Sequence, residues 1–162
     1  MIFITVGSQK FQFNRLLRKM DELIQGGTVK DEVFAQTGAS DYRPVHYPWI
    51  DFMNATIYAE MEERADLILT HGGTGAILGG VKKGKKVIAV PRLACYGEHV
   101  DDHQIQLLAQ FEKMKIICVC WDIDRLGDLL KEIQEIELQP YQSNTAAIIS
   151  SIETFLSGGQ KI

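Results

Sequence analysis

Short apolar runs alternate along the chain with longer segments in which apolar residues recur every three or four positions. The short runs have the length of buried strands, and the longer segments have the period of amphipathic helices. This alternation is typical of β-α-β units and a parallel sheet. We therefore predict an α/β fold in which residues 1–162 form a single domain, with about six parallel strands and helices on both faces.

The expected elements follow from these two periods. The predicted strands cover residues 2–6, 32–36, 44–47, 66–70, 87–90 and 116–119. The predicted helices cover residues 13–24, 51–64, a segment through 77–78, a segment through 105–111, residues 126–136 and residues 149–156. Asp51 is the expected N-cap of the second helix, and Asp101 or Asp102 that of the fourth, with Asp101 preferred.

Composition narrows the classes of function. The 17 Lys and Arg residues against 21 Asp and Glu residues give a net charge of -4, which leaves no basic excess for binding nucleic acid. Three cysteines, Cys95, Cys118 and Cys120, make no disulfide set and suggest a reducing, cytoplasmic compartment. No stretch approaches the roughly 18 to 20 apolar residues of a membrane span, so work at a membrane would need another protein.

Two glycine turns follow predicted strands, where ligands of open α/β sheets bind. Gly7 and Ser8 come directly after the first strand, and a tight turn there explains them as well as a ligand does. The second turn, His71-Gly72-Gly73-Thr74-Gly75, opens a helix and leaves backbone N–H groups bare, which suits a phosphate or pyrophosphate. Close packing of the helix on the sheet is the alternative. The run lacks the Lys-Ser/Thr of a P-loop and the third glycine of a dinucleotide fingerprint.

A third candidate is the long polar loop of residues 92–104. Such loops in small domains are usually functional or mobile. Arg92 could neutralise phosphate, and Asp102 and Gln104 could hydrogen-bond sugar hydroxyls. Glu98, His99 and His103 lie in the same loop, although capping and solvation are the plainer roles for its polar groups.

Metal binding and nucleophilic catalysis have weaker support. His71, His99 and His103, with Asp102, match no common zinc spacing. The Asp122-Ile123-Asp124 sequence has the D-x-D form that can hold a divalent cation, but its place at a helix start favours N-capping. Cys118 and Cys120 share one face of a strand and are expected to be buried free thiols. We therefore expect neither a metal nor another cofactor.

Two separated motifs carry a resemblance to a known family. The segments ADLILTHGGTGAILGGVKKGKKVIAVPR and GEHVDDHQIQLLAQF resemble the donor-binding, C-terminal half of GT-B glycosyltransferases of family 28, a Rossmann-like domain. The family pattern is H-x-G-x-G, then G-K-x-x-I-x-V-P, then D-x-H-Q. A stand-alone half of this length is similar to Alg13-like subunits, and the GEHVDDHQ stretch is similar to PssE-type subunits of capsule and exopolysaccharide synthesis.

The resemblance implies a UDP-sugar across the carboxyl edge of the sheet. The pyrophosphate would lie against Gly7-Ser8 and residues 73–75, and uracil near the backbone of Trp49 and Ile50. The donor sugar would meet Asp102, His103 and Gln104. Many relatives have Glu at the position of Gly79, where it binds the ribose, and this chain has no such side chain there.

The resemblance also implies a missing half. The acceptor site and usually the base lie in the other half of GT-B enzymes, which here would be a membrane-anchored, Alg14-like subunit. The chain would then be the catalytic subunit of an inverting hexosyltransferase, of galactose or glucose type, that acts on a lipid-linked saccharide at the cytoplasmic membrane face. Residues 142–156 would help to dock the partner, unless their apolar stripe lies in the chain's own core.

Three alternatives stay open. The chain could be a non-catalytic accessory subunit that enhances a membrane-associated glycosyltransferase, or an Alg13-type subunit of a GlcNAc transferase. It could also be an NADP-binding oxidoreductase domain in which Arg92 binds the 2′-phosphate.

Overall fold

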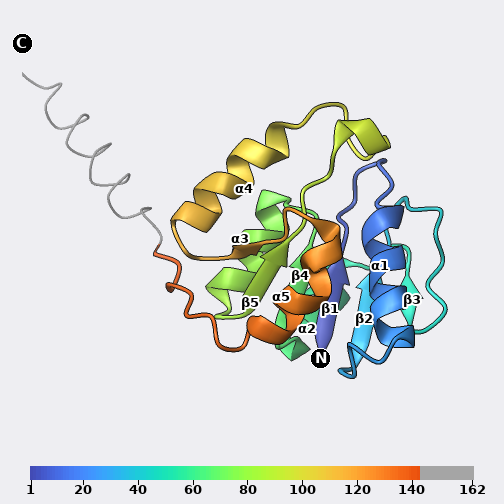
Figure 1. The fold of residues 1–162 in the computed structure, drawn as a ribbon, viewed down its shortest axis with the longest axis horizontal. Coiled ribbons are helices and arrows are strands. Elements are labelled where there is room, and N and C mark those ends of the chain that lie inside the picture. Colours follow the sequence, from blue (N-terminus) through green and yellow to red (C-terminus); the bar gives the residue numbers. More distant parts are fainter. Residues whose placement is uncertain (143–162) are drawn as a thin grey trace, which may run out of the picture.

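The computed structural model describes residues 1–142, which form one parallel sheet flanked by helices (Figure 1). The strands are β1 (Ile2–Thr5), β2 (Val33–Gln36), β3 (Trp49–Ile50), β4 (Leu67–Thr70), β5 (Lys86–Ala89) and β6 (Cys118–Val119). The helices are α1 (Asn14–Gln25), α2 (Ala55–Arg64), α3 (Thr74–Lys82), α4 (His103–Lys113) and α5 (Leu126–Glu132), with short 3-10 helices η1 (Ala94–Tyr96) and η2 (Ile123–Arg125). The predicted Rossmann-like α/β fold is confirmed. The predicted helix 149–156 lies outside the described residues.

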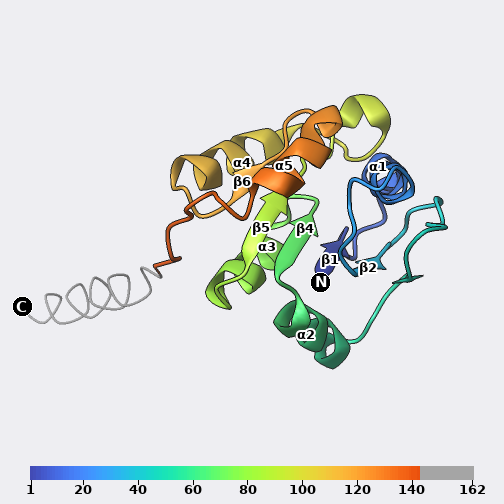
Figure 2. The same cartoon turned by 60° about the horizontal axis from the view of Figure 1, so that its bottom comes forward.

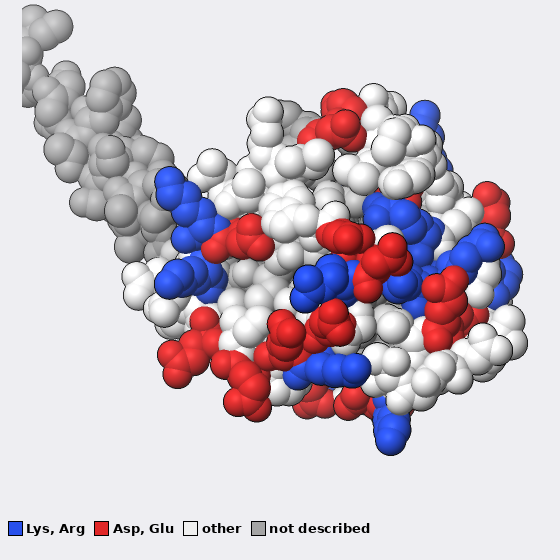
Figure 3. All heavy atoms as spheres, viewed as in Figure 1, with Lys and Arg blue, Asp and Glu red and all other residues white. Residues whose placement is uncertain are grey.

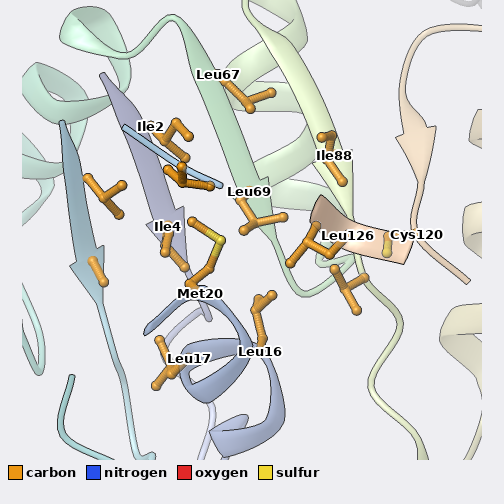
Figure 4. Close-up of a cluster of buried hydrophobic side chains, with 14 of the residues drawn as sticks. Ile2, Ile4, Leu16, Leu17, Met20, Leu67, Leu69, Ile88, Cys120 and Leu126 are labelled. Atoms are coloured by element: carbon orange, nitrogen blue, oxygen red, sulfur yellow. The ribbon is translucent and has the colours of Figure 1, made fainter. Parts of the chain in front are cut away.

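Alternate residues of each strand enter two separate cores, because successive side chains of a strand point to opposite faces. Ile2 and Ile4 pack with α1 and α5 on one face, whereas Phe3 packs with α2, α3 and α4 on the other. Figure 4 shows the first core, where Leu16, Leu17 and Met20 of α1 meet the strands. Figure 2 shows the sheet between α1 and α5 above and α2 below. Both faces of the sheet are therefore covered, as predicted.

The strand order locates the crevice of the sheet. The order is β3-β2-β1-β4-β5-β6, and all five pairings are parallel. From β1 the chain adds β2 and β3 on one side of the sheet, and it then crosses to the other side of β1 to form β4, β5 and β6. The strand order thus reverses between β1 and β4. In open α/β sheets, ligands bind at the carboxyl ends of the strands at such a switch point. The turns after β1 and β4 therefore lie where a ligand is expected.

The predicted strand at 44–47 is wrong, and β3 starts at Trp49, two residues after the predicted strand ends. The backbone N–H groups of Val45 and His46 donate to the buried carboxylate of Asp21, each at 2.8 Å, so they are not available for a sheet. Burial acts to raise the pKa of Asp21, but hydrogen bonds from Tyr42, Val45 and His46 outweigh it and hold the pKa below its ordinary value. A contact with α1 thus decides where this strand begins.

Two predicted helix starts also differ. Asn54, not Asp51, caps α2, and its side chain accepts from the N–H of Ile57 at 2.9 Å. Asp51 instead accepts from the Thr37 hydroxyl at 3.1 Å and pairs with Arg43. Before α4 the N-cap position belongs to Asp102, one of the two predicted residues, but its side chain makes no capping hydrogen bond. The last strand and α5 are shorter than predicted, while Ile116, Ile117 and Ile133 are buried beside them.

Candidate functional site

A cavity of about 600 Å³ lies at the switch point, between the ends of β1, β2 and β4 and the starts of α2 and α3. It is lined by Thr5, Gly7, Ser8, Gln9, Gln36, Met53, Ala55, Tyr58, His71, Gly73, Thr74, Gly75 and Ala76. Six of these residues, Gly7, Ser8, His71, Gly73, Thr74 and Gly75, are among the predicted binding residues. The two glycine turns thus meet in one site, although 64 residues of sequence separate Gly7 from His71.

His71 fills the space between the two turns. A Cβ on Gly7 would lie 2.6 Å from Cε1 of His71, and a Cβ on Gly73 would lie 2.5 Å from its Nε2. Gly7 also has a φ of +78°, which favours glycine. At these two positions the missing side chain is explained by packing against the imidazole.

The imidazole of His71 is held in its neutral form. Burial lowers the pKa of His71 to about 4, and the nearby positive charge of Arg92 acts in the same direction. Its Nδ1 lies 3.4 Å from the carbonyl oxygen of Thr5, a contact that requires the proton on Nδ1. Nε2 is then left as an acceptor beside Gly73.

Gly75 differs from the other glycines of the run. A Cβ on Gly72 would contact Leu108 and one on Gly80 would overlap Ile68 and Val87, whereas a Cβ on Gly75 would meet nothing within 4 Å. Helix–sheet packing therefore accounts for Gly80 but not for Gly75. Gly75 lies in the first turn of α3 and lines the cavity, where the leading N–H groups of a helix have no acceptor within the helix.

The other predicted binding residues lie outside this cavity. Trp49 lies in β3, where its Nε1 donates to the carbonyl of Pro44 and its ring contacts Arg43. The remaining six, Arg92, Glu98, His99, Asp102, His103 and Gln104, belong to the loop after β5 or the start of α4. Neither these seven residues nor Gly72, the eighth, is among those that line the cavity.

Arg92 is completely buried beneath the β1–α1 loop rather than exposed for a phosphate. Its Nη2 donates to the carbonyls of Val6 at 2.6 Å and Phe11 at 3.1 Å, which flank that loop. Burial lowers the pKa of Arg92 to about 10, against the opposing effect of Glu98. The guanidinium therefore holds the loop that carries Gly7 and Ser8.

Glu98 is also completely buried, and its carboxylate is occupied by protein groups. It accepts from Nε and Nη2 of Arg15 at 3.0 and 2.9 Å, and from the N–H of Leu93 at 3.0 Å. Arg15 also donates to the carbonyl of Pro91. Glu98 thus joins the 92–104 loop to α1.

The rest of the loop is braced in the same way. Oδ1 of Asp102 accepts from the N–H of Ala94 at 2.8 Å, and Oε1 of Gln104 accepts from the N–H of Arg92 at 3.1 Å. The ring of His99 contacts that of Phe11. His103 is the first residue of α4. These contacts place Asp102 and Gln104 at the carboxyl end of β5. The cavity lies at the same edge of the parallel sheet.

Sequence reasoning missed one wall of the cavity. Met53, Ala55 and Tyr58 come from the start of α2, and Gln36 ends β2. A polar residue at the end of an otherwise apolar strand was a usable signal for Gln36. Nothing in the spacing of the α2 residues distinguishes them from ordinary core positions. They reach the cavity only because β2 and α2 flank β1.

At Gly79, a neighbouring acidic side chain occupies the space beside the backbone. A Cβ there would overlap Oε1 of Glu62, a buried carboxylate that pairs with Lys83 at 2.8 Å. A larger side chain at position 79 is thereby excluded unless Glu62 moves.

Local contacts occupy Asp122 and Asp124, the two acidic residues of the D-x-D sequence. Asp122 caps η2 by accepting from the N–H of Asp124, whose own carboxylate pairs with Lys19. Among the side chains that the structure describes, which leave out His103, no group of three or more His, Cys, Asp or Glu residues could hold a metal ion. Cys118 and Cys120 are buried free thiols, as expected, and Cys95 is exposed.

Comparisons with known proteins show what the fold is similar to. No sequence of a curated protein matches the chain. The fold is similar to that of ALG13 in solution, with a TM-score of 0.59 and 20% identity over 96% of this chain and 94% of that one. It is also similar to MurG of Acinetobacter baumannii (TM-score 0.58, 17% identity) and to the kitacinnamycin glycosyltransferase (0.58, 18%). These two matches cover 81% and 83% of this chain, but only 40% and 34% of the longer chains with which it is compared.

The family follows from a separate comparison. A model of the glycosyltransferase family 28 C-terminal domain matches residues 1–158, which is nearly the whole chain. The two glycine turns of the chain meet at the switch point of a Rossmann-like sheet, where open α/β sheets bind their ligands. The chain therefore belongs to the glycosyltransferase family 28 C-terminal domain family.

Proposed function

We propose that this chain binds the UDP-sugar donor of an inverting glycosyltransferase. Gly75 is the observation that carries the proposal. It lacks a side chain at the first turn of α3, borders the cavity, and has no packing neighbour that explains the glycine. Bare N–H groups at a helix N-terminus bind phosphate groups well. A diphosphate bound to these N–H groups explains why the residue at this position has no side chain.

The rest of the donor follows from the walls of the site. The diphosphate lies against α3 and the Gly7-Ser8 turn, and the nucleoside extends towards Met53 and Tyr58. The sugar extends the other way, towards Asp102, His103 and Gln104 at the carboxyl end of β5. The departing UDP is stabilised by the N–H groups of α3 and needs no metal ion.

The acceptor and the base belong to a partner in this proposal. None of the residues that line the cavity is Asp or Glu. The chain spans about a third to two-fifths of the longer glycosyltransferases that it resembles in fold. Within residues 1–142, no helix is long and apolar enough to cross a membrane. A membrane-anchored, Alg14-like subunit supplies the missing half and the lipid-linked saccharide acceptor.

The proposed pathway and sugar are based on the GEHVDDHQ stretch. Its likeness to PssE-type subunits favours transfer of galactose or glucose in capsule or exopolysaccharide synthesis over transfer of GlcNAc. The accessory role is the second candidate, because the cavity holds no carboxylate that could act as the base.

Calorimetric titration of the chain with UDP, UDP-galactose, UDP-glucose, UDP-GlcNAc and NADPH tests the proposal. We expect binding of the UDP compounds, with or without EDTA, and none of NADPH. Gly75→Ala should weaken UDP binding at least tenfold while it raises stability by up to about 1 kcal/mol, because alanine is the better helix former. Gly84→Ala, a turn glycine at φ +69° far from the site, controls for glycine replacement. Equal affinity of Gly75→Ala and wild type would contradict the proposal.

A further inference from the structure

Arg92 is a buried cation beneath the loop of the proposed diphosphate site. Its side chain is completely buried, and Nη2 donates to the carbonyl oxygens of Val6 at 2.6 Å and Phe11 at 3.1 Å. Nε and Nη1 are buried without a hydrogen-bond partner. Burial lowers the pKa of Arg92 only to about 10, so the guanidinium stays charged at neutral pH. A buried charge is costly unless it is well paired, and bracing two carbonyls needs no charge.

The cavity itself offers no cationic side chain to a diphosphate. Among the described residues that line it, none is Lys or Arg, and His71 is neutral because its pKa is lowered to about 4. The charge of Arg92 contributes to that lowering, so it acts inside the cavity although Arg92 is not part of the wall. A diphosphate bound here would therefore meet positive potential from Arg92 and from the N-terminus of α3.

The peptide between Val6 and Gly7 connects Arg92 to the cavity. Arg92 lies on the side of the sheet that α1 covers, where its guanidinium is 5.4 Å from the centre of the Phe13 ring, and the Val6 carbonyl points to it. The described residues contain no cis peptide bond, so the Gly7 N–H points the opposite way. On that opposite side lie α2 and α3, whose first residues form the cavity wall together with Gly7.

Resting on the donor-binding function above, we propose that Arg92 is a positioning residue for the diphosphate: its guanidinium fixes and polarises the Val6–Gly7 peptide, so that the Gly7 N–H donates to a diphosphate oxygen. Arg92 itself touches no ligand. A charge-assisted hydrogen bond to the carbonyl makes the N–H of the same peptide a stronger donor. Because the charge lies in the protein interior, water and salt screen it little.

The first test needs no variant. In 1H–15N spectra of the full chain, UDP should move the amide proton of Gly7 downfield, because a hydrogen bond to a phosphate oxygen forms. Uridine has no phosphate and should leave that proton nearly unmoved. The amide of Gly84, a turn glycine outside the cavity, should respond to neither ligand. A Gly7 amide proton that saturating UDP does not move would overturn the proposal.

Arg92→Met and Arg92→Lys supply the second arm. Arg92→Met should bind UDP about tenfold or more weakly than wild type but uridine within about twofold of it, because only the diphosphate depends on the Gly7 N–H. Arg92→Lys keeps a positive donor near the Val6 carbonyl and should bind UDP within about threefold of wild type. At saturating UDP, the shift of the Gly7 amide should be smaller in Arg92→Met than in Arg92→Lys.

Arg125→Met is the matched control. The Arg125 side chain is 69% exposed and pairs with Asp128 outside the cavity, so the variant should bind both ligands like wild type. Urea unfolding shows which variants are folded. If Arg92→Met is not, the Gly7 amide of wild type and the Arg92→Lys variant decide, and a folded Arg92→Lys that has lost UDP binding would overturn the proposal.

The outcomes separate the role of Arg92 from the donor-binding function. If wild type binds no UDP compound, the donor-binding function fails and the role of Arg92 with it. If wild type binds UDP but Arg92→Met binds it within about twofold of wild type, only the role of Arg92 is overturned. Equal losses of UDP and uridine affinity in Arg92→Met would show that Arg92 only maintains the loop, and would also overturn that role.

Discussion

At the scale of single residues, His71 links the site to the stability of the fold. The folded protein holds its imidazole neutral, with a pKa of about 4 against an ordinary value of 6.5. Between these two values the unfolded chain binds more protons than the folded one. Stability is therefore complete above about pH 6.5 and falls as the pH falls towards 4.

This difference in the pKa of His71 predicts that the free energy of unfolding changes measurably with pH. Because one pKa unit is worth about 1.4 kcal/mol, His71 should make the free energy of unfolding about 2 kcal/mol lower at pH 5 than at pH 7. Urea denaturation at the two pH values measures it. His71→Asn should remove most of that difference, and a slope that is unchanged in the variant would contradict the prediction.

At the scale of elements, contacts between the 92–104 loop and α1 fix the edge of the site. Arg15 forms an ion pair with the buried Glu98, Gln12 donates to the carbonyl of Tyr96, and Arg92 holds both ends of the β1–α1 loop. On the face that Figure 3 shows, by contrast, acidic and basic groups are interspersed at the surface. The ion pair of Arg15 with the buried Glu98 therefore stabilises the fold more than the surface pairs do, because exposed ion pairs contribute little to stability.

Glu98→Gln tests this contact. It removes the charge that pairs with Arg15 and that favours the charged form of the buried Arg92, and should lower the free energy of unfolding by about 3 kcal/mol. Urea denaturation measures the change, and Glu60→Gln, on the exposed side of α2, should have little effect. If Glu98→Gln abolished donor binding without any loss of stability, Glu98 would be a ligand contact instead.

At the scale of the whole molecule, the proposed function assigns the donor site to this chain and the acceptor site to a partner. We expect the chain alone to bind UDP-sugar but to transfer no sugar to a lipid-linked acceptor, and to do so once the membrane-anchored partner is added. A radiolabelled-sugar assay with the chain, the partner and both together measures this. Transfer by the chain alone, abolished by Gly75→Ala, would show that the catalytic machinery is complete without a partner.

Much of the fold could be predicted because its signals are local. The 2–6 strand, the 13–24 helix and the glycine turns follow from residue spacing within short segments, and Gly7 and Gly73 were found for this reason. The 44–47 strand was misplaced because Asp21, over twenty residues earlier in the chain, holds the backbone of Val45 and His46. The burial of Arg92 and Glu98 could not be predicted, because a sequence shows charge but not burial.

By itself the sequence determined the alternation of strands and helices, the parallel sheet and the two turns that can approach a phosphate. These depend on periodicity and on glycine, which act over a few neighbouring residues. Only the tertiary structure decided that His71 lies between both turns, that Gln36 and Tyr58 complete the cavity, and that Arg92 and Glu98 are buried. Those roles depend on contacts between segments distant in sequence, which strand order and packing create.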